Sequence, residues 1–189
     1  MMDTSDNTGH LNILAGNDNR DIDFEIRQAC FQVGDMEHFL SWLRDISQRN
    51  CVSIVCFNAD LMAGQEHVIS AMLHAKRAQK QSTCISGSFE IEALLYASGS
   101  RQCLDAIKFG VRQGSNHCYI CIFPVNPGVW SDLLTVMAIS DEDWEQISEE
   151  KMNLLVPWFG ITNDEIAVTG KNRLRDLILE RVALLDVYK

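Results

Sequence analysis

The sequence predicts an α+β fold, a single domain in which a small mixed or antiparallel sheet of about three to four strands is covered by about seven helices. Three short apolar runs of strand length occur among longer segments whose apolar residues recur at helical spacing. A chain of 189 residues that is 47% hydrophobic and 22% charged can bury a sizeable core. Neither an internal repeat nor a linker divides it, so we expect one domain over residues 22–189.

Residues 1–21 differ in composition from this domain. They are rich in Asp, Asn, Thr and Gly, apart from the short apolar run LNILAG. Such a segment buries little apolar surface, so we expect a loose tail with at most one edge strand.

The first half of the domain is expected to hold two strands with a helix between them. A set of apolar residues indicates the first strand: Phe24, Ile26, Phe31 and Val33. Asp35 is a good helix N-cap, and apolar residues follow it at helical spacing: Met36, Phe39, Leu40, Leu43 and Ile46. Residues 51–57, CVSIVCF, then predict a short buried strand that ends at Asn58.

Helices predominate after this strand. Three are predicted at 65–80, 88–98 and 101–109, separated by the turn residues Ser86-Gly87-Ser88 and Gly99 and closed by Gly110. A third strand is predicted at 117–123, before Pro124 and Pro127. Helical patterns follow at 130–139 and 143–155. Asn172 is expected to cap a final helix with an apolar face formed by Leu174, Leu177, Ile178, Val182 and Leu185.

Charge is unevenly distributed in this chain, whose net charge is -10. Residues 67–112 hold a local excess of +3, which leaves -13 for the remainder; the bases are Lys76, Arg77, Lys80, Arg101, Lys108 and Arg112, and the acids are Glu90, Glu92 and Asp105. Such a segment can form a basic surface. Residues 139–150 hold six acids and no base, which indicates either a solvated face or a surface that meets a basic partner.

The sequence lacks the features of exported and membrane proteins. Its apolar stretches are far shorter than the ~20 residues that cross a bilayer, and its start, MMDTSDNTGH, has no basic flank or apolar run of a signal peptide. Seven cysteines, an odd number, argue against a disulfide framework. We therefore expect a cytoplasmic protein with reduced thiols that does not meet a membrane.

The helix predicted at 65–80 carries a polar stripe of His67, Ser70, His74 and Arg77 on an otherwise apolar surface. The two histidines are about 10 Å apart along the axis, which is too far for one metal ion. Either both histidines are hydrogen-bonded where this helix packs on its neighbours, or the stripe faces a ligand and meets phosphate or base.

The residues from Ser86 to Gln102 can likewise be explained either by a structural role or by ligand binding. Ser86, Ser88 and Glu90 suit the start of a helix, which is a sufficient structural reason for them. The tight corner before Arg101 brings free backbone N–H groups beside a guanidinium, a combination that suits an anion or a phosphodiester. The alternative is that Arg101 forms a salt bridge or caps a neighbouring carbonyl.

Enzyme signatures are absent. No phosphate-binding glycine loop, HExxH zinc motif or GxSxG nucleophile motif occurs, and the Cys118-x-x-Cys121 pair lies in a predicted strand. We therefore expect a protein without catalytic residues, metal or cofactor. A small-molecule enzyme that uses His67 or His74 is the least favoured alternative.

Several ordered motifs resemble one small family, the Cgi-type subunit of the KEOPS complex, also known as the PRPK-binding protein family. The matching pieces are Gly64, Glu66 and His67, His74-Ala75, Arg77-Ala78, Ser86-x-Ser88-x-Glu90, Leu94-Leu95-Tyr96-Ala97-Ser98-Gly99, Arg101-Gln102, Ala106-Ile107 and residues 180–186. The chain departs from the family pattern beside the Arg-Gln pair, where it has Ser100 and Cys103.

The resemblance implies a non-catalytic accessory subunit in tRNA threonylcarbamoyladenosine modification. Its implied partners are the small atypical kinase of the complex, the 3' CCA end of tRNA and, through the kinase, the rest of KEOPS. We expect RNA contacts at His74, Lys76, Arg77, Lys80, Ser86, Arg101 and Gln102. We expect kinase contacts at Leu177, Leu184 and Leu185 on the final helix. The main alternative is a kinase-docking regulator with little affinity for RNA.

Overall fold

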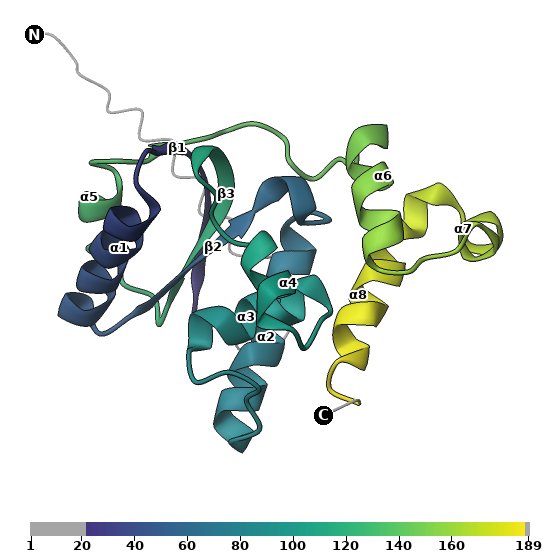
Figure 1. Cartoon of the computed structure of the whole chain (residues 1–189), viewed down its shortest axis with the longest axis horizontal. Helices are drawn as coiled ribbons and strands as arrows, with labels where there is room; N and C mark the ends of the chain where they lie inside the picture. The colour runs from purple at the N-terminus through teal and green to yellow at the C-terminus, as the bar shows by residue number, and fades with distance from the viewer. Residues whose placement is uncertain (1–21, 188–189) are drawn as a thin grey trace, which may run out of the picture.

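A four-stranded antiparallel sheet lies at the centre of residues 22–187, the part of the chain that this computed structural model describes (Figure 1). Its order is β2-β3-β1-β4, with the strands β1 Glu25–Val33, β2 Ser53–Asn58, β3 Gly114–Phe123 and β4 Ala138–Ile139. The predicted α+β fold is thereby confirmed. The expected tail at 1–21 lies outside the described residues.

The helices lie in layers on the two faces of this sheet (Figure 1). One face is covered by α1 Met36–Asn50 and the short α5 Val129–Leu133. On the other face lie α2 Gln65–Gln81, α3 Phe89–Ser98 and α4 Cys103–Lys108. The helices α6 Glu149–Trp158 and α8 Leu174–Leu184 lie farther from the sheet and pack on this group of helices (Figure 1). Three shorter elements complete the chain: η1 Ala59–Leu61, α7 Asn163–Thr169 and η2 Lys171–Arg173.

Alternation along the central strand β3 creates two separate cores. Tyr119 and Cys121 point to the α2 side, whereas Cys118, Ile120 and Ile122 point to the α1 side. Successive residues of a strand face opposite sides of a sheet, so a strand with helices on both faces must be apolar throughout. This explains why the sequence of β3 shows a continuous apolar run instead of a period of two.

The predicted elements before residue 124 are confirmed to within a few residues, but three later predictions are wrong. The segment 130–139 is helical only as far as Leu133, because Ala138 pairs with Cys30 of β1 in the sheet. Helix α6 starts at Glu149 instead of residue 143, because Ser148 is its N-cap and its hydroxyl accepts the Lys151 N–H.

The third wrong prediction concerns the start of the final helix. Asn172 lies within the turn η2, and Arg173 is the N-cap of α8. Helix α7 was not predicted at all, although Thr162 and Glu165 form a capping box at its start. The helix is only 7 residues long and has no buried residue, so it leaves no apolar period in the sequence.

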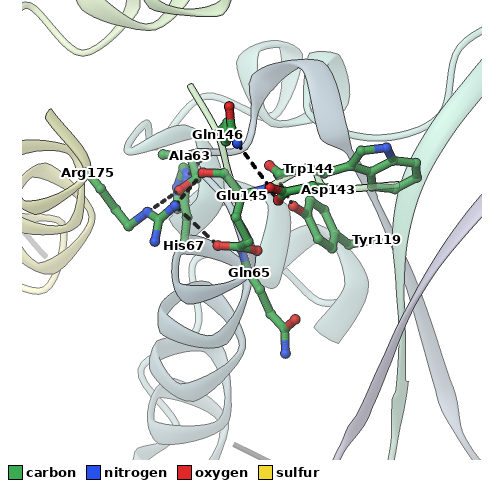
Figure 2. Close-up of polar contacts among 9 residues, drawn as sticks. All are labelled: Ala63, Gln65, His67, Tyr119, Asp143, Trp144, Glu145, Gln146 and Arg175. Atoms are coloured by element: carbon green, nitrogen blue, oxygen red, sulfur yellow. Dashed lines mark hydrogen bonds and ion pairs between the residues drawn. The ribbon is translucent and has the colours of Figure 1, made fainter. Parts of the chain in front are cut away.

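Arg175 of the final helix connects the acidic loop 140–148 to the start of α2 through hydrogen bonds and an ion pair (Figure 2). The Arg175 guanidinium donates to the carbonyls of Ala63 (2.7 Å) and Glu145 (2.6 Å) and pairs with the Glu145 carboxylate at 3.1 Å. That carboxylate in turn accepts the Gln65 N–H at 2.7 Å. Because α2 has no side-chain cap of its own, Glu145 supplies an acceptor and a negative charge to its N-terminus.

Within residues 22–187, no helix has the length and apolar character that a bilayer span requires.

Gly64 occupies the crowded corner before α2, and its replacement tests this arrangement. Its φ is +91°, and an added Cβ would lie 2.6 Å from Glu145 Oε2 and 2.7 Å from Arg175 Nη2. We expect Gly64→Ala to lower the free energy of unfolding by about 1–3 kcal/mol, measured by urea titration. The matched control is Gly87→Ala, where a Cβ would meet nothing within 4 Å. Equal stability of the two variants would contradict this account.

Candidate binding surface

The polar stripe predicted on α2 runs from the interior of the protein to its surface. His67 is fully buried, Ser70 and His74 are half-buried, and Arg77 is exposed. The residues are spaced by three or four positions and so share one side of the helix. The two histidines therefore stand in different surroundings.

His67 is a neutral structural residue that joins α2 to α3. Its Nδ1 accepts the Ala63 N–H at 3.1 Å, and its Nε2 lies 2.9 Å from the Ala97 carbonyl oxygen, to which it donates. The Phe159 ring packs edge-on against it at 5.7 Å. Burial lowers the pKa of His67 to about 3. With both ring nitrogens bonded to the backbone and no exposed surface, His67 cannot act as a base for an external substrate.

His74 belongs to a cluster that joins α2, α3 and the end of α8. Its Nδ1 lies 2.6 Å from Asp186 Oδ2, and its ring stacks on Tyr96 with centroids 5.2 Å apart. The Tyr96 hydroxyl donates to the other oxygen of Asp186, and Arg77 lies 3.6 Å from the same carboxylate. Burial and the Asp186 hydrogen bond raise the pKa of Tyr96 well above its usual value. Arg77 is the most exposed of the three charged or ionisable side chains joined at Asp186, with 56% of its side-chain surface accessible.

The residues predicted to contact RNA differ in how accessible they are. Lys80, Arg101 and Gln102 are exposed, as is Arg77. Lys76 forms an ion pair with Asp23 and lies over the Phe123 ring, 5.4 Å from its centroid. Ser86 is half-buried and its hydroxyl accepts the Ser88 N–H. The predicted basic segment is therefore partly neutralised by acids of the same chain, including the pairs Arg77–Asp186, Lys108–Asp105 and Arg112–Asp60.

The structure places these residues at the two ends of an antiparallel helix pair. The bond between His67 and Ala97 holds the end of α3, and hence Arg101, beside the start of α2. Lys80 lies in the last turn of α2, 13 residues from His67, which corresponds to roughly 20 Å along the axis. The predicted RNA contacts therefore form two separate sets. One set runs from His74 to Ser86, and the other is the Arg101-Gln102 pair.

Of the three leucines predicted to contact a kinase, Leu184 is the most exposed. Leu177 and Leu185 lie in the core, with 8% and 4% of their surface exposed. Leu184 is half-buried and lines a depression of about 360 Å³ together with Trp158 and Gly99. Leu184 is therefore the one of these three leucines with appreciable exposed surface, although Leu185 also lines the depression.

Sequence analysis missed the apolar side chains on the outside of α4. Leu104 and Ile107 are 79% and 53% exposed and lie one helical turn apart. Lys108 of the same helix stands over the Trp158 ring, 5.0 Å from its centroid, so α4 borders the depression that Leu184 lines. The signal in the sequence was two large apolar residues on a six-residue helix, which is too short to bury both sides.

Among residues 22–187, no three His, Cys, Asp or Glu side chains are grouped so that they could hold a metal ion. The groups gathered here are exposed cations, exposed apolar side chains and histidines engaged in packing. They define a small α+β protein that presents surfaces for binding.

Comparison with known proteins identifies the family within this class. Residues 32–186 match the family described as kinase binding protein CGI-121. The chain is also 30% identical over 133 residues to the regulatory protein Cgi121 of Methanocaldococcus jannaschii, an alignment that covers 70% of this chain and 82% of the relative. The protein belongs to the CGI-121 family.

The buried neutral His67 predicts a specific dependence of stability on pH. The folded protein favours the neutral imidazole, whereas the unfolded chain takes up a proton near the ordinary pKa of 6.5. This contribution to stability is therefore complete above about pH 6.5 and is lost as the pH falls toward 3. Between pH 7.5 and 5, wild type should lose about 2 kcal/mol more free energy of unfolding than His67→Gln.

Urea unfolding at the two pH values measures this difference. His38→Gln, at an exposed position of α1, is the matched control and should follow the wild-type pH dependence. Equal losses of the free energy of unfolding in wild type and His67→Gln would show that His67 is not the source of the predicted pH dependence.

Proposed function

We propose that the protein is a non-catalytic accessory subunit of the KEOPS complex in the cytoplasm, where it binds the atypical kinase of the complex and the 3' CCA end of tRNA. Membership of a family described as kinase binding is the observation that carries the kinase half of this proposal. The tRNA half rests on the motif resemblance, on the exposed cations Arg77 and Lys80 of α2, and on Arg101 just before α4. Catalysis of threonylcarbamoyladenosine formation would then belong to the partner subunits, and this chain would contribute binding and placement.

The depression beside Leu184 supports the kinase contact. Apolar side chains that remain exposed on a small protein commonly mark interaction surfaces, and aromatic residues such as Trp158 contribute strongly to them. Leu184, Trp158 and the outer side of α4 offer such a surface next to the guanidinium of Arg181. We therefore place the kinase on α4, α6 and the end of α8.

The exposed bases support the RNA contact. Arg77 and Arg101 flank the helix pair, and Lys80 has no carboxylate within ion-pair distance among the described residues. The pair between Arg77 and Asp186 is long, at 3.6 Å, and partly solvated, so a phosphate can compete for this guanidinium. Single-stranded nucleotides would contact these cations through their phosphates.

A kinase-docking regulator with little affinity for RNA is the second candidate. The observation in its favour is the neutralisation of Lys76, Arg77, Lys108 and Arg112 by acids of the same chain. Together with the net charge of -10, this pairing weakens the long-range attraction of RNA.

The kinase contact is tested by placing a charge at Leu184. We expect Leu184→Asp to abolish copurification with the kinase and to preserve cooperative unfolding, because an unpaired charge buried in an interface costs several kcal/mol. Leu177→Asp should unfold the protein instead, since Leu177 is only 8% exposed. Leu40→Asp, on the opposite side of the sheet, is the control that should still copurify. Wild-type stoichiometry with Leu184→Asp would place the kinase elsewhere.

The RNA contact is tested by removing both arginines. Arg77→Ala combined with Arg101→Ala should weaken tRNA binding in an electrophoretic shift, with a nearly unchanged thermal melt. The slope of log affinity against log salt should become shallower by about 0.7 for each lost phosphate contact with a single strand. Removal of the CCA end from the tRNA should weaken binding to wild type.

The matched control for this variant is Arg44→Ala combined with Arg49→Ala on α1, which lies on the other face of the sheet. This control should bind tRNA as wild type does. Undiminished binding by the folded Arg77 and Arg101 variant would refute this placement, and weak binding by wild type itself would favour the second candidate.

A further inference from the structure

A second recess lies between α6 and the end of β2. It has a volume of about 750 Å³ and is lined by η1, the end of α4, the loop 140–148 and the first half of α6. This volume falls within the range of about 300–1,000 Å³ that is typical of ligand sites. None of the residues predicted to contact RNA or the kinase lines it. We call it the α6 cleft.

Two hydrogen-bond donors in the α6 cleft lack a partner. Asn58 is only 6% exposed; its side-chain oxygen accepts the Asp60 N–H at 3.1 Å, but its amide nitrogen has no acceptor among the described residues. Lys151 is half-buried, and no carboxylate of the described chain lies within ion-pair distance of its ammonium group. Both nitrogens line the cleft and neither is enclosed away from solvent, so both donors are available to an acceptor supplied by a ligand.

The ammonium of Lys151 is an excess charge in its surroundings. The nearby acids are already engaged, Asp60 with Arg112 at 2.9 Å and Glu145 with Arg175 at 3.1 Å. Burial lowers the pKa of Lys151, although Asp60 and Glu145 are close enough to oppose that shift. The inner part of the cleft therefore has an excess of one positive charge, which suits a single anionic group.

The exposed part of the α6 cleft has the opposite character. Its charged lining residues Glu142, Asp143 and Glu150 are all exposed, and none forms an ion pair with a base of the described chain. The exposed bases that line the cleft, Lys108 and Arg112, are engaged with Asp105 and Asp60. A ligand that enters this cleft thus passes three carboxylates before it reaches Lys151.

We propose that the α6 cleft binds the C-terminal end of a basic polypeptide. The terminal carboxylate accepts hydrogen bonds from Lys151 and Asn58, and lysine or arginine side chains upstream of it meet the exposed carboxylates. Capture of a terminal carboxylate is an established mode of peptide recognition. Trp144 and Leu154, which also line the cleft, offer apolar surface to the last side chain of the peptide.

This charge arrangement excludes two other ligand classes. A polyphosphate or a nucleic acid brings several negative charges past Glu142, Asp143 and Glu150, where like charges repel. A neutral peptide end, such as an amide, leaves the ammonium of Lys151 without a counter-charge. The favourable ligand is therefore dipolar, with one negative end and positive charges behind it.

The test compares three acetylated hexapeptides by isothermal titration calorimetry with the full-length protein at low salt. The first, Gly-Lys-Arg-Lys-Ala-Leu, has a free carboxylate; the second is its C-terminal amide; the third has glutamate in place of its three basic residues. We expect the free acid to bind at least tenfold more tightly than the amide and the acidic peptide to show no binding. Equal affinity of acid and amide, or no binding of the free acid at millimolar concentration, would overturn the proposal.

Variants identify the cleft as the site. Lys151→Met should remove the preference for the free acid while the thermal melt stays at or above the wild-type value, because it replaces a half-buried unpaired ammonium. Asn58→Asp keeps the acceptor for the Asp60 N–H but replaces the amide donor with a carboxylate, and should also weaken binding.

Lys171→Met, at an exposed position of η2, is the matched control and should bind as wild type does. Undiminished preference for the free acid in folded Lys151→Met would overturn the proposal. So would binding of an oligocytidylate to wild type that Lys151→Met abolishes, since this would make the α6 cleft an RNA site.

Discussion

The interactions of the buried imidazole of His67 determine how the helices on one face of the sheet are arranged. Its Nδ1 accepts a hydrogen bond from the Ala63 N–H, and its Nε2 donates one to the Ala97 carbonyl. One side chain therefore connects the start of α2 with the end of α3. The neighbouring backbone groups bind the remaining helices. The Ala63 carbonyl accepts from Arg175 of α8, and the Ser98 carbonyl accepts from the Trp158 indole of α6. Four helices therefore meet around polar backbone groups that would otherwise be buried without partners.

This junction also determines where the surface features lie relative to one another. The end of α3 reaches the surface beside Trp158 and Leu184, since Gly99 lines the same depression. Arg101 follows Gly99 by two residues, so a protein seated on Leu184 would lie near the backbone of Arg101. Lys80, about 20 Å away along α2, would remain outside such a contact. If the kinase and RNA bind together, their sites would adjoin at Arg101 and diverge toward the end of α2.

The sequence was sufficient to predict the elements that obey a single period or carry a strong cap. The helix that starts after Asp35 and the buried strand at Ser53–Asn58 are of this kind. The sequence was insufficient where pairing between distant segments determines the secondary structure. For example, β4 is a strand only because it pairs with β1. The candidate surface was predictable in part. A polar stripe on α2 follows from spacing, but spacing does not distinguish the buried His67 from the exposed Arg77, because burial depends on helices far away in the sequence.

Charge illustrates the same limit and shows how structure changes its meaning. An excess of +3 over residues 67–112 suggests a basic surface, yet the ion pairs of Lys76 and Arg112 draw on Asp23 and Asp60, which lie outside that segment. Conversely, the strongly acidic loop 140–148 is not simply solvated. Glu145 serves the start of α2, whereas Glu142 and Asp143 border a cleft whose inner lysine lacks a counter-ion. Net charge along the chain thus indicates the class of partner poorly, and the charges left unpaired after folding are the ones that a partner meets.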